Sequence, residues 1–326
     1  MMANARLESK PKPGPPVSNT TWWTDRRLRW HASPIASLDD LPPPVKAALV
    51  EQLKPGETIR QIISAPRQHV LGTGVAGWRR WLAAVLPWDW TPDWTLVVTN
   101  SRLLAAASTS ADDVPVVTAT PIADLLSFEL GTILLFSWFD WTWANEGRLE
   151  RQRIYFNTVS DRLFWDALLF LRRSLITDAD LPPPQSGRGL ERLAHLPYKF
   201  KNLIPHRLLL PDEEIQALVY RPDIWTARKG PFRRKRASAL ALALTNYHLV
   251  ITQEDSGADL ANYGLITCYC PRGRIGEVTV TRTGDDVWLK VTLEHSGAEK
   301  VLRVLFEPAA EQGLRELVAK LEARVL

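Results

Sequence analysis

Residues 96–104, LVVTNSRLL, and residues 242–250, LALTNYHLV, decide the fold, because both stretches lie inside two copies of one longer pattern. Upstream of them, residues 53–66 (LKPGETIRQIISAP) are matched by residues 209–222 (LLPDEEIQALVYRP). Self-similarity that keeps its order along the chain indicates duplicated structural units. The sequence therefore predicts two copies of one fold, and a length of 326 residues leaves room for two domains of ordinary size.

Within each copy the apolar residues mostly follow the period of β-strands. Leu240, Leu242 and Leu244 alternate with alanines, and the Thr-Asn pair that follows is typical of a tight turn, since Asn tolerates the left-handed region. Similar runs predict further strands at 114–118, 125–130, 133–143 and 153–156, and at 278–281, 287–293 and 300–306. Leucines at helical spacing predict closing helices over 161–175 and 308–326, and prolines predict the start of a short helix over 45–53.

About seven antiparallel strands followed by one helix resemble the pleckstrin-homology (PH) superfold. The Pro-Gly-Glu entry, the Thr-Asn-x-[Arg/His]-Leu hairpin and a Phe before the last helix (Phe156 and Phe306) are similar to the bacterial PH-like domain family. The resemblance covers about residues 39–175 and 205–326. It implies a mainly β fold of the α+β class, with two PH-like seven-stranded antiparallel barrels or sandwiches, each ending in a C-terminal helix. Another small barrel or sandwich, duplicated in tandem, is the alternative.

Four segments follow from this interpretation. Residues 1–38 are expected to form a disordered or docking tail, and residues 39–176 the first PH-like domain with a Trp-rich inserted loop. Residues 177–204 contain LPPPQSGRG, which lacks periodicity and predicts an extended Pro-rich linker. Residues 205–326 are expected to form the second PH-like domain.

Composition limits the class of protein. The chain is 45% hydrophobic and 23% charged, which is typical of a globular protein and not of a disordered one. No stretch reaches the about 20 apolar residues of a membrane-spanning helix, and the N-terminus lacks the apolar region of a secretory signal. We therefore expect a cytoplasmic protein. The pI of about 9.1 directs attention to clustered positive charge.

A basic cluster lies between the first two strands of the second copy, in ARKGPFRRKRAS. Its six cations are Arg228, Lys229, Arg233, Arg234, Lys235 and Arg236. Crowded like charges favour an anionic partner such as phosphate. The PH resemblance implies that this loop lines a headgroup pocket, although bacterial PH-like domains are not generally lipid-headgroup readers. A solvated loop tip without ligand is the other interpretation, and nucleic acid is the least favoured partner.

A Trp-rich insertion occupies the corresponding position of the first copy, GWRRWLAAVLPWDWTPDW. Apolar residues at helical spacing predict a short amphipathic helix whose Trp, Leu and Arg suit the headgroup boundary of a membrane. The candidate contact residues are Trp78, Arg79, Arg80, Trp81, Leu82, Trp88 and Trp90. The alternative is that this helix packs on its own domain or on the other copy.

A third candidate surface lies in the run ILLFSWFDWTW, where Phe139, Trp141 and Trp143 project to one side of a strand that is apolar on both faces. Such a strand must be covered twice. Cover by neighbouring parts of the chain is one interpretation, and contact with a protein partner or a second copy is the other.

Signals for an enzyme are weak. Gly72, Gly74 and Gly77 spell GxGxxG, but Pro87 ends the following helix too early for a dinucleotide-binding fold. The six histidines are scattered, and Cys268 and Cys270, at i and i+2 of a strand, are expected to be buried reduced thiols and not a redox pair. We expect no catalytic residues, no cofactor and no metal.

The sequence thus favours a non-enzymatic adaptor that associates peripherally with an anionic membrane, at its inner face, through the Trp-rich loop and the basic loop. The alternative is a soluble protein-interaction scaffold or self-assembling subunit that uses the Trp-rich surfaces without membrane binding.

Overall fold

The computed structural model describes residues 30–68, 91–110, 113–133, 136–176, 189–226, 235–254 and 264–323. Over these residues the protein is mainly β, with antiparallel strands and a few helices, as the sequence predicts. The strands form four sheets, and no sheet closes into a barrel within the described ranges.

The described residues of the first half form eight strands and two helices. The strands are β1 (Ser33–Pro34), β2 (Ile59–Ala65), β3 (Asp93–Thr99), β4 (Arg102–Ser108), β5 (Val116–Pro121), β6 (Leu125–Ile133), β7 (Phe136–Asn145) and β8 (Arg148–Asn157). The helices are α1 (Pro43–Gln52), which begins at prolines as predicted, and α3 (Asp161–Ser174). Strands β1 to β5 form one sheet in chain order.

In the second half, the part of the chain that the structure describes contains nine strands and two helices. The strands are β9 (Ile215–Arg221), β10 (Ile224–Trp225), β11 (Lys235–Ala237), β12 (Leu240–Thr245), β13 (His248–Glu254), β14 (Gly264–Pro271), β15 (Ile275–Thr283), β16 (Asp286–His295) and β17 (Ala298–Phe306). The helices are α4 (Tyr198–Leu203) and α5 (Glu311–Glu322). Strands β15 to β17 form a sheet of their own, and β10 and β11 form a short ribbon.

The same order of elements occurs in both halves. In each, four strands (β2 to β5; β9 and β12 to β14) precede three strands and a helix (β6 to β8 and α3; β15 to β17 and α5). The predicted closing helices and the predicted Thr-Asn hairpins are therefore confirmed.

A glutamate explains why the Thr-Asn stretch recurs. In the first half, Glu57 accepts hydrogen bonds from Thr99 Oγ1 (3.1 Å) and Arg102 Nε (2.8 Å), and the backbone N–H of Arg102 donates to Thr99 Oγ1 (2.8 Å). Asn100 Oδ1 accepts from the N–H of Thr58 (3.1 Å). We call this arrangement of Glu57, Thr99 and Arg102 the first glutamate clasp. It ties the start of β2 to the β3–β4 turn.

The second half repeats the arrangement with Glu213, Thr245 and His248, the second glutamate clasp. Glu213 Oε1 accepts from Thr245 Oγ1 (2.6 Å) and lies 3.0 Å from His248 Nδ1, while the N–H of His248 donates to Thr245 Oγ1 (2.8 Å). Asn246 Oδ1 accepts from the N–H of Glu214 (2.9 Å). The repeated sequence motif is therefore a structural device that holds a hairpin.

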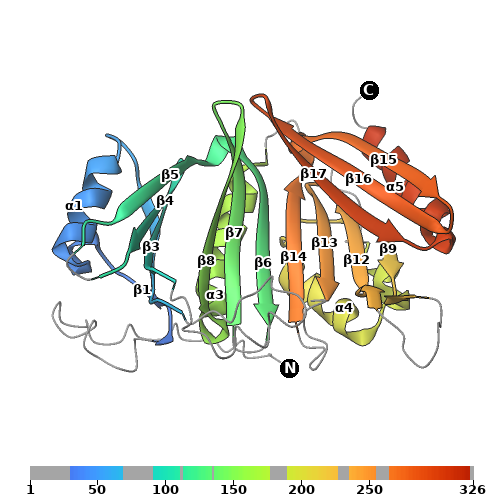
Figure 1. The fold of residues 1–326 in the computed structure, drawn as a ribbon, viewed down its shortest axis with the longest axis horizontal. Helices are drawn as coiled ribbons and strands as arrows, with labels where there is room; N and C mark the ends of the chain where they lie inside the picture. The colour runs from blue at the N-terminus through green and yellow to red at the C-terminus, as the bar shows by residue number, and fades with distance from the viewer. Residues whose placement is uncertain are drawn as a thin grey trace, which may run out of the picture.

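The two halves share one sheet, which the sequence did not predict. Strand β6 of the first half pairs with β14 of the second, so that a seven-stranded sheet runs in the order β8-β7-β6-β14-β13-β12-β9. Figure 1 shows this sheet in the middle of the molecule, with β15 to β17 in front of its second part and α3 and α4 behind it. Phe128 pairs with Tyr269 at this joint.

A buried arginine also crosses between the halves. Arg172, on α3 of the first half, donates from Nη2 to Glu213 (2.5 Å) and from Nη1 to the carbonyl of Leu208 (2.8 Å). Its guanidinium carbon lies 4.3 Å from the centre of the Tyr269 ring. Arg172 and Glu213 have no exposed surface. Burial alone would raise the pKa of Glu213, but the Arg172 charge and the bonds from His248 and Thr245 outweigh it and lower the pKa to about 2.

The largest hydrophobic core contains side chains that were candidates for a contact surface. It lies between the first sheet, β6 to β8 and α3, and it continues into the second half through Val250 and Tyr269. Phe139 and Trp141 are 0% exposed and Trp143 is 4% exposed, so these side chains belong to this core. Cover by the chain itself, one of the two interpretations, is therefore confirmed on this face, and the assignment of these three residues to a partner contact is wrong. The physical reason is that the strand is covered on this face by the chain itself.

Part of the predicted linker is folded. Residues 190–208 form helical turns and α4, and they pack into the same core through Leu193, Leu196, Phe200 and Ile204. Their spacing of three to four residues is the helical signal that the assignment of a linker up to residue 204 overlooked. Within the described chain, no helix has the length and apolar character needed to traverse a bilayer.

Candidate anion-binding site beside the basic loop

The basic cluster is only partly visible in the structure. Arg228, Lys229, Arg233 and Arg234 lie in residues 227–234, outside the described residues, whereas Lys235 and Arg236 begin β11. The Trp-rich insertion, with Trp78, Arg79, Arg80, Trp81, Leu82, Trp88 and Trp90, falls in residues 69–90 and is also outside them. What the structure does define is the framework from which the basic loop leaves.

That framework is held by buried polar contacts. Asp223 accepts from the N–H of Ala239 (2.7 Å) and forms an ion pair with Lys235 (3.0 Å), so the two ends of the loop are joined. Strand β9 ends at Arg221, whose buried guanidinium donates to the carbonyls of Leu305 (2.5 Å) and Ser238. Burial lowers the pKa of Arg221 to about 10, which still leaves it charged at neutral pH. The strand ends are thus fixed on the sheet below them.

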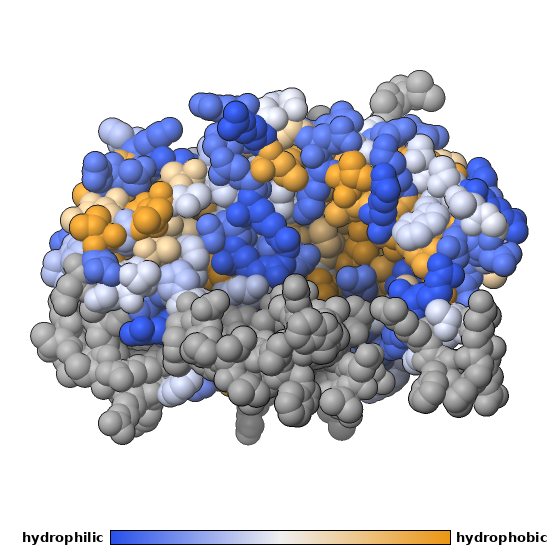
Figure 2. Space-filling model, viewed as in Figure 1, coloured by the Kyte–Doolittle hydropathy of each residue, from blue (hydrophilic) through white to orange (hydrophobic). Residues whose placement is uncertain are grey.

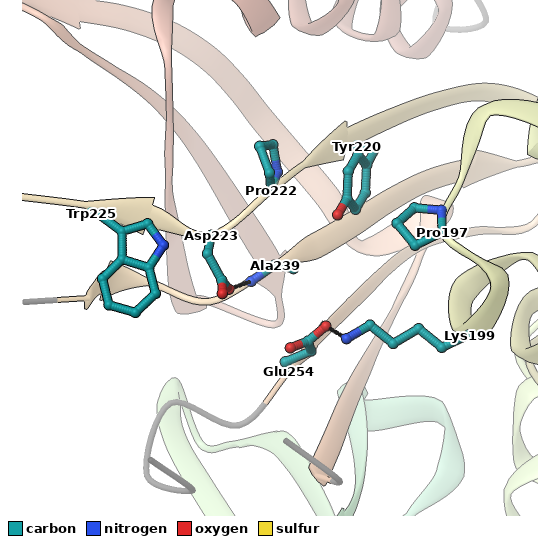
Figure 3. Close-up of a pocket in the computed structure, with 8 residues that line it drawn as sticks. All are labelled: Pro197, Lys199, Tyr220, Pro222, Asp223, Trp225, Ala239 and Glu254. Carbon is teal, nitrogen blue, oxygen red and sulfur yellow. Dashed lines mark hydrogen bonds and ion pairs between the residues drawn. The ribbon is translucent and has the colours of Figure 1, made fainter. Parts of the chain in front are cut away.

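A pocket of about 450 Å³ opens beside this framework. Its lining residues come from β9, β10, β13, the start of β12 and the segment that begins α4. They are Pro197, Lys199, Tyr220, Pro222, Asp223, Trp225, Ala239 and Glu254. Figure 3 shows Lys199 and Glu254 pointing toward each other across one side, with Asp223 and Trp225 on the other. The pocket lining includes Asp223 and Trp225, the last part of the described chain before the basic loop.

The charges inside the pocket are largely paired. Lys199 forms an ion pair with Glu254, and desolvation lowers the pKa of Lys199. Asp223 is neutralised by Lys235. A pocket whose own charges cancel offers an anion little beyond hydrogen bonds, so any strong attraction must come from the loop that leaves it.

Lys235 and Arg236 are also engaged within the chain. Arg236 donates through both Nη atoms to Asp286 (3.0 and 2.7 Å), and this contact holds the pKa of Asp286 below its usual value. A phosphate that approaches Arg236 would compete with this carboxylate. Of the six cations predicted to bind an anion, the two that the structure describes therefore already have acidic partners.

Two exposed aromatic rings flank the pocket, and the sequence analysis did not single them out. Tyr198 is 80% exposed and Trp225 is 45% exposed, although residues of this size are usually more covered. The ammonium of Lys235 lies 5.4 Å from the centre of the Trp225 ring. Tyr198 begins α4, next to Lys199 and the exposed Lys201. Tyr198 stands beside Lys199 in the sequence, a pair too common to be recognised without the fold, and Trp225 has no charged neighbour on either side.

The site offers little chemistry of the catalytic kind. No group of three or more His, Cys, Asp or Glu side chains that could hold a metal ion occurs among the residues that the structure describes. The second glutamate clasp contains a His beside a carboxylate, but His248 and Glu213 are fully buried and cannot reach a substrate.

No model of a known protein family matches the sequence, and a comparison with curated proteins finds no similar chain.

Proposed function

We propose that the protein is a non-enzymatic adaptor made of two PH-like domains that associates peripherally with an anionic membrane surface through residues 227–234. The repeated order of four strands, three strands and a helix supports the PH-like assignment. In that interpretation the basic loop joins the first and second strands of the second domain, where PH domains commonly bind headgroups.

The observation that carries the proposal is the group of side chains around the loop. Trp225 and Tyr198 expose amphipathic rings beside the pocket, and Lys201 adds an exposed cation on the same helix as Tyr198. Trp and Tyr favour the headgroup region because their apolar body and polar tip suit a boundary between oil and water. Four further cations follow Trp225 within nine residues. Aromatic insertion and charge attraction would therefore act on the same patch of membrane.

Electrostatic attraction sets the expected strength. Each basic residue near an anionic surface contributes about 1 kcal/mol, so the four cations of residues 227–234 contribute up to about 4 kcal/mol together. Attraction of this kind weakens as salt rises. The Trp-rich insertion is part of the proposal as a second contact.

Cosedimentation with vesicles tests the proposal. Wild type is expected to pellet with vesicles of phosphatidylserine and phosphatidylcholine, less so at high salt, and weakly with phosphatidylcholine alone. Changing Arg228, Lys229, Arg233 and Arg234 to Ser should lower the partition coefficient at least about tenfold. Trp225→Ala and Tyr198→Ala should each lower it by a smaller factor without changing its salt dependence.

A matched variant controls for net charge. Arg60, Arg148, Arg162 and Arg303 are exposed and form no ion pair among the described residues. Changing these four to Ser removes the same charge from other places and should leave most of the vesicle binding intact. Equal loss in both quadruple variants would show a non-specific charge effect. If wild type ignores every vesicle, the membrane proposal is wrong, and mass that depends on protein concentration would favour the scaffold.

A further inference from the structure

Cys268 and Cys270 are the two cysteines of the chain, and they lie side by side on β14. Both are free, and their Sγ atoms are 3.9 Å apart. Both side chains pack toward the core that β14 shares with β15 to β17. Cys270 is buried as expected, whereas Cys268 is partly exposed. Figure 2 shows that this face of the molecule is hollowed over β14, beneath β17. One residue of the pair thus keeps some solvent exposure.

A lysine is held close to this pair. Lys300, on β17, donates to Ser127 Oγ (2.7 Å) and Thr142 Oγ1 (2.9 Å), two neutral hydroxyls of β6 and β7. Among the described residues, no carboxylate forms an ion pair with it. Its charge acts on both thiols. The ammonium is thus anchored by groups that do not neutralise it.

The two thiols are not equivalent. The contact between the two sulfurs is the main cause that lowers the pKa of Cys268; burial opposes it, and the Lys300 charge adds to it. The same contact, together with burial, raises the pKa of Cys270. The nearby carboxylates oppose the effect on Cys268, but Asp140 is bound by Arg151 (2.6 Å) and Arg153 (2.8 Å). Cys268 is therefore the residue of the pair whose thiol loses its proton more easily, which is the arrangement of an attacking thiol.

We propose that Cys268 and Cys270 form a thiol redox site that reacts with hydroperoxides. The Cys268 thiolate attacks the peroxide, the O–O bond breaks, and Cys268 becomes a sulfenic acid while an alcohol or water leaves. The Cys270 sulfur then attacks the Cys268 sulfur, the S–O bond breaks and water leaves, which forms the disulfide. Two thiols and one hydroperoxide thereby give one disulfide, one alcohol or water, and one further water.

A metal site is the competing use of two adjacent thiols. Two sulfurs 3.9 Å apart would suit bonds of about 2.3 Å to one ion. However, the described residues supply no third His, Cys, Asp or Glu ligand, and the Lys300 ammonium repels a metal cation while it attracts a thiolate. The lysine therefore favours redox chemistry over metal binding.

The position in the sheet makes this disulfide reversible. Residues i and i+2 of a strand have Cα atoms about 6.6 to 6.8 Å apart, at the upper end of the range that disulfides span. Oxidation must draw β14 together at Tyr269, which pairs with Phe128 at the joint between the halves. A strained disulfide is easily reduced. The oxidised protein should also melt at a lower temperature, because the contraction disturbs this joint.

The test treats the folded full-length protein with hydrogen peroxide, blocks remaining thiols with N-ethylmaleimide under denaturing conditions and measures intact mass. Wild type should lose both thiols and about 2 Da, reversibly with dithiothreitol, faster than free cysteine reacts. Cys270→Ser should stop at a sulfenic acid that dimedone traps. Cys268→Ser should keep its thiol. Lys300→Met should slow the reaction about tenfold or more, and Lys290→Met, on neighbouring β16, should not.

Several results would overturn the proposal. One is that wild type keeps both thiols, or loses them no faster than free cysteine. Another is that Cys268→Ser and Cys270→Ser react alike. A third is that the chain binds one equivalent of Cu(I) through both thiols and forms no disulfide, which would assign the pair to a metal. Thermal unfolding of each reduced variant verifies that the comparison is made on folded protein.

Discussion

Replacing Arg172 by Met should destabilise the protein strongly, because it leaves Glu213 buried without its cation. The two side chains have no exposed surface, and the contact connects α3 of the first half with the segment before β9 of the second. Met is similar to Arg in length, but its side chain is apolar and cannot donate a hydrogen bond. The carbonyl of Leu208 also loses its guanidinium donor.

The expected loss follows from the surroundings of the carboxylate. Removing one partner of a buried ion pair typically costs about 3 to 5 kcal/mol of unfolding free energy. Glu213 would keep donors from the N–H of Leu210 (2.8 Å), from Thr245 (2.6 Å) and from His248 (3.0 Å). These bonds place the estimate toward the lower end, at about 3 kcal/mol. Arg173→Met is the matched control, since its ion pair with Asp212 is half exposed and should contribute less than about 1 kcal/mol.

Urea unfolding, followed by tryptophan fluorescence, measures these losses, and equal m-values show that the unfolded states are comparable. Adding Glu213→Gln to Arg172→Met removes the stranded charge, so the double variant should be more stable than the sum of the two single losses predicts, by at least about 1 kcal/mol. Additive losses, or a loss below about 1 kcal/mol for Arg172→Met, would show that the pair does not hold the halves together.

Three further predictions concern single positions. Burial lowers the pKa of His248 from 6.5, so below that pH the unfolded chain binds a proton that the folded chain does not. The unfolding free energy should therefore decrease as the pH falls below about 6.5, by up to about 1.4 kcal/mol per pH unit. Urea unfolding at pH values from 7 to 5 measures this decrease, which should be smaller in His248→Asn. Gly131→Ala places a Cβ 2.1 Å from the Trp138 ring and should lower the unfolding free energy by about 1 to 3 kcal/mol. In Gly313→Ala, inside α5, the nearest atom to the new Cβ is 3.5 Å away, so this variant should gain about 0.4 to 1 kcal/mol. Thermal unfolding of both variants measures the two effects. Glu57→Gln should destabilise by about 1.5 to 3 kcal/mol, because Glu57 accepts a charged hydrogen bond from Arg102, and urea unfolding measures the loss.

Local patterns in the sequence predicted the secondary structure well. Alternating leucines at 240, 242 and 244 became β12, and the Thr-Asn turns became two hairpins with the same hydrogen bonds. These features depend on neighbours along the chain, which is why periodicity reveals them. The closing helices followed for the same reason, since their apolar faces are visible as i, i+3 and i+4 spacing.

Features that depend on distant neighbours could not be predicted. Nothing in the composition of β6 or β14 says that their edges pair, because backbone hydrogen bonds carry no side-chain signature. The same limit applies to Trp141, because the sequence leaves open whether the chain itself or a partner covers it, and only the fold shows that it is buried under the first sheet. At the candidate site, the sequence pointed to the charges, but the exposure of Tyr198 and Trp225 became visible only in the fold.

The two glutamate clasps differ in where the positive charge comes from, and this difference connects the two halves. In the first clasp, Arg102 supplies the guanidinium that neutralises Glu57 from within the same hairpin. In the second, the corresponding position is His248, which is uncharged when buried and cannot balance Glu213. Arg172 supplies the missing guanidinium from the helix that closes the first half. The first half thus supplies the cation that the second clasp lacks, so we expect the stability of the second half to depend on the first.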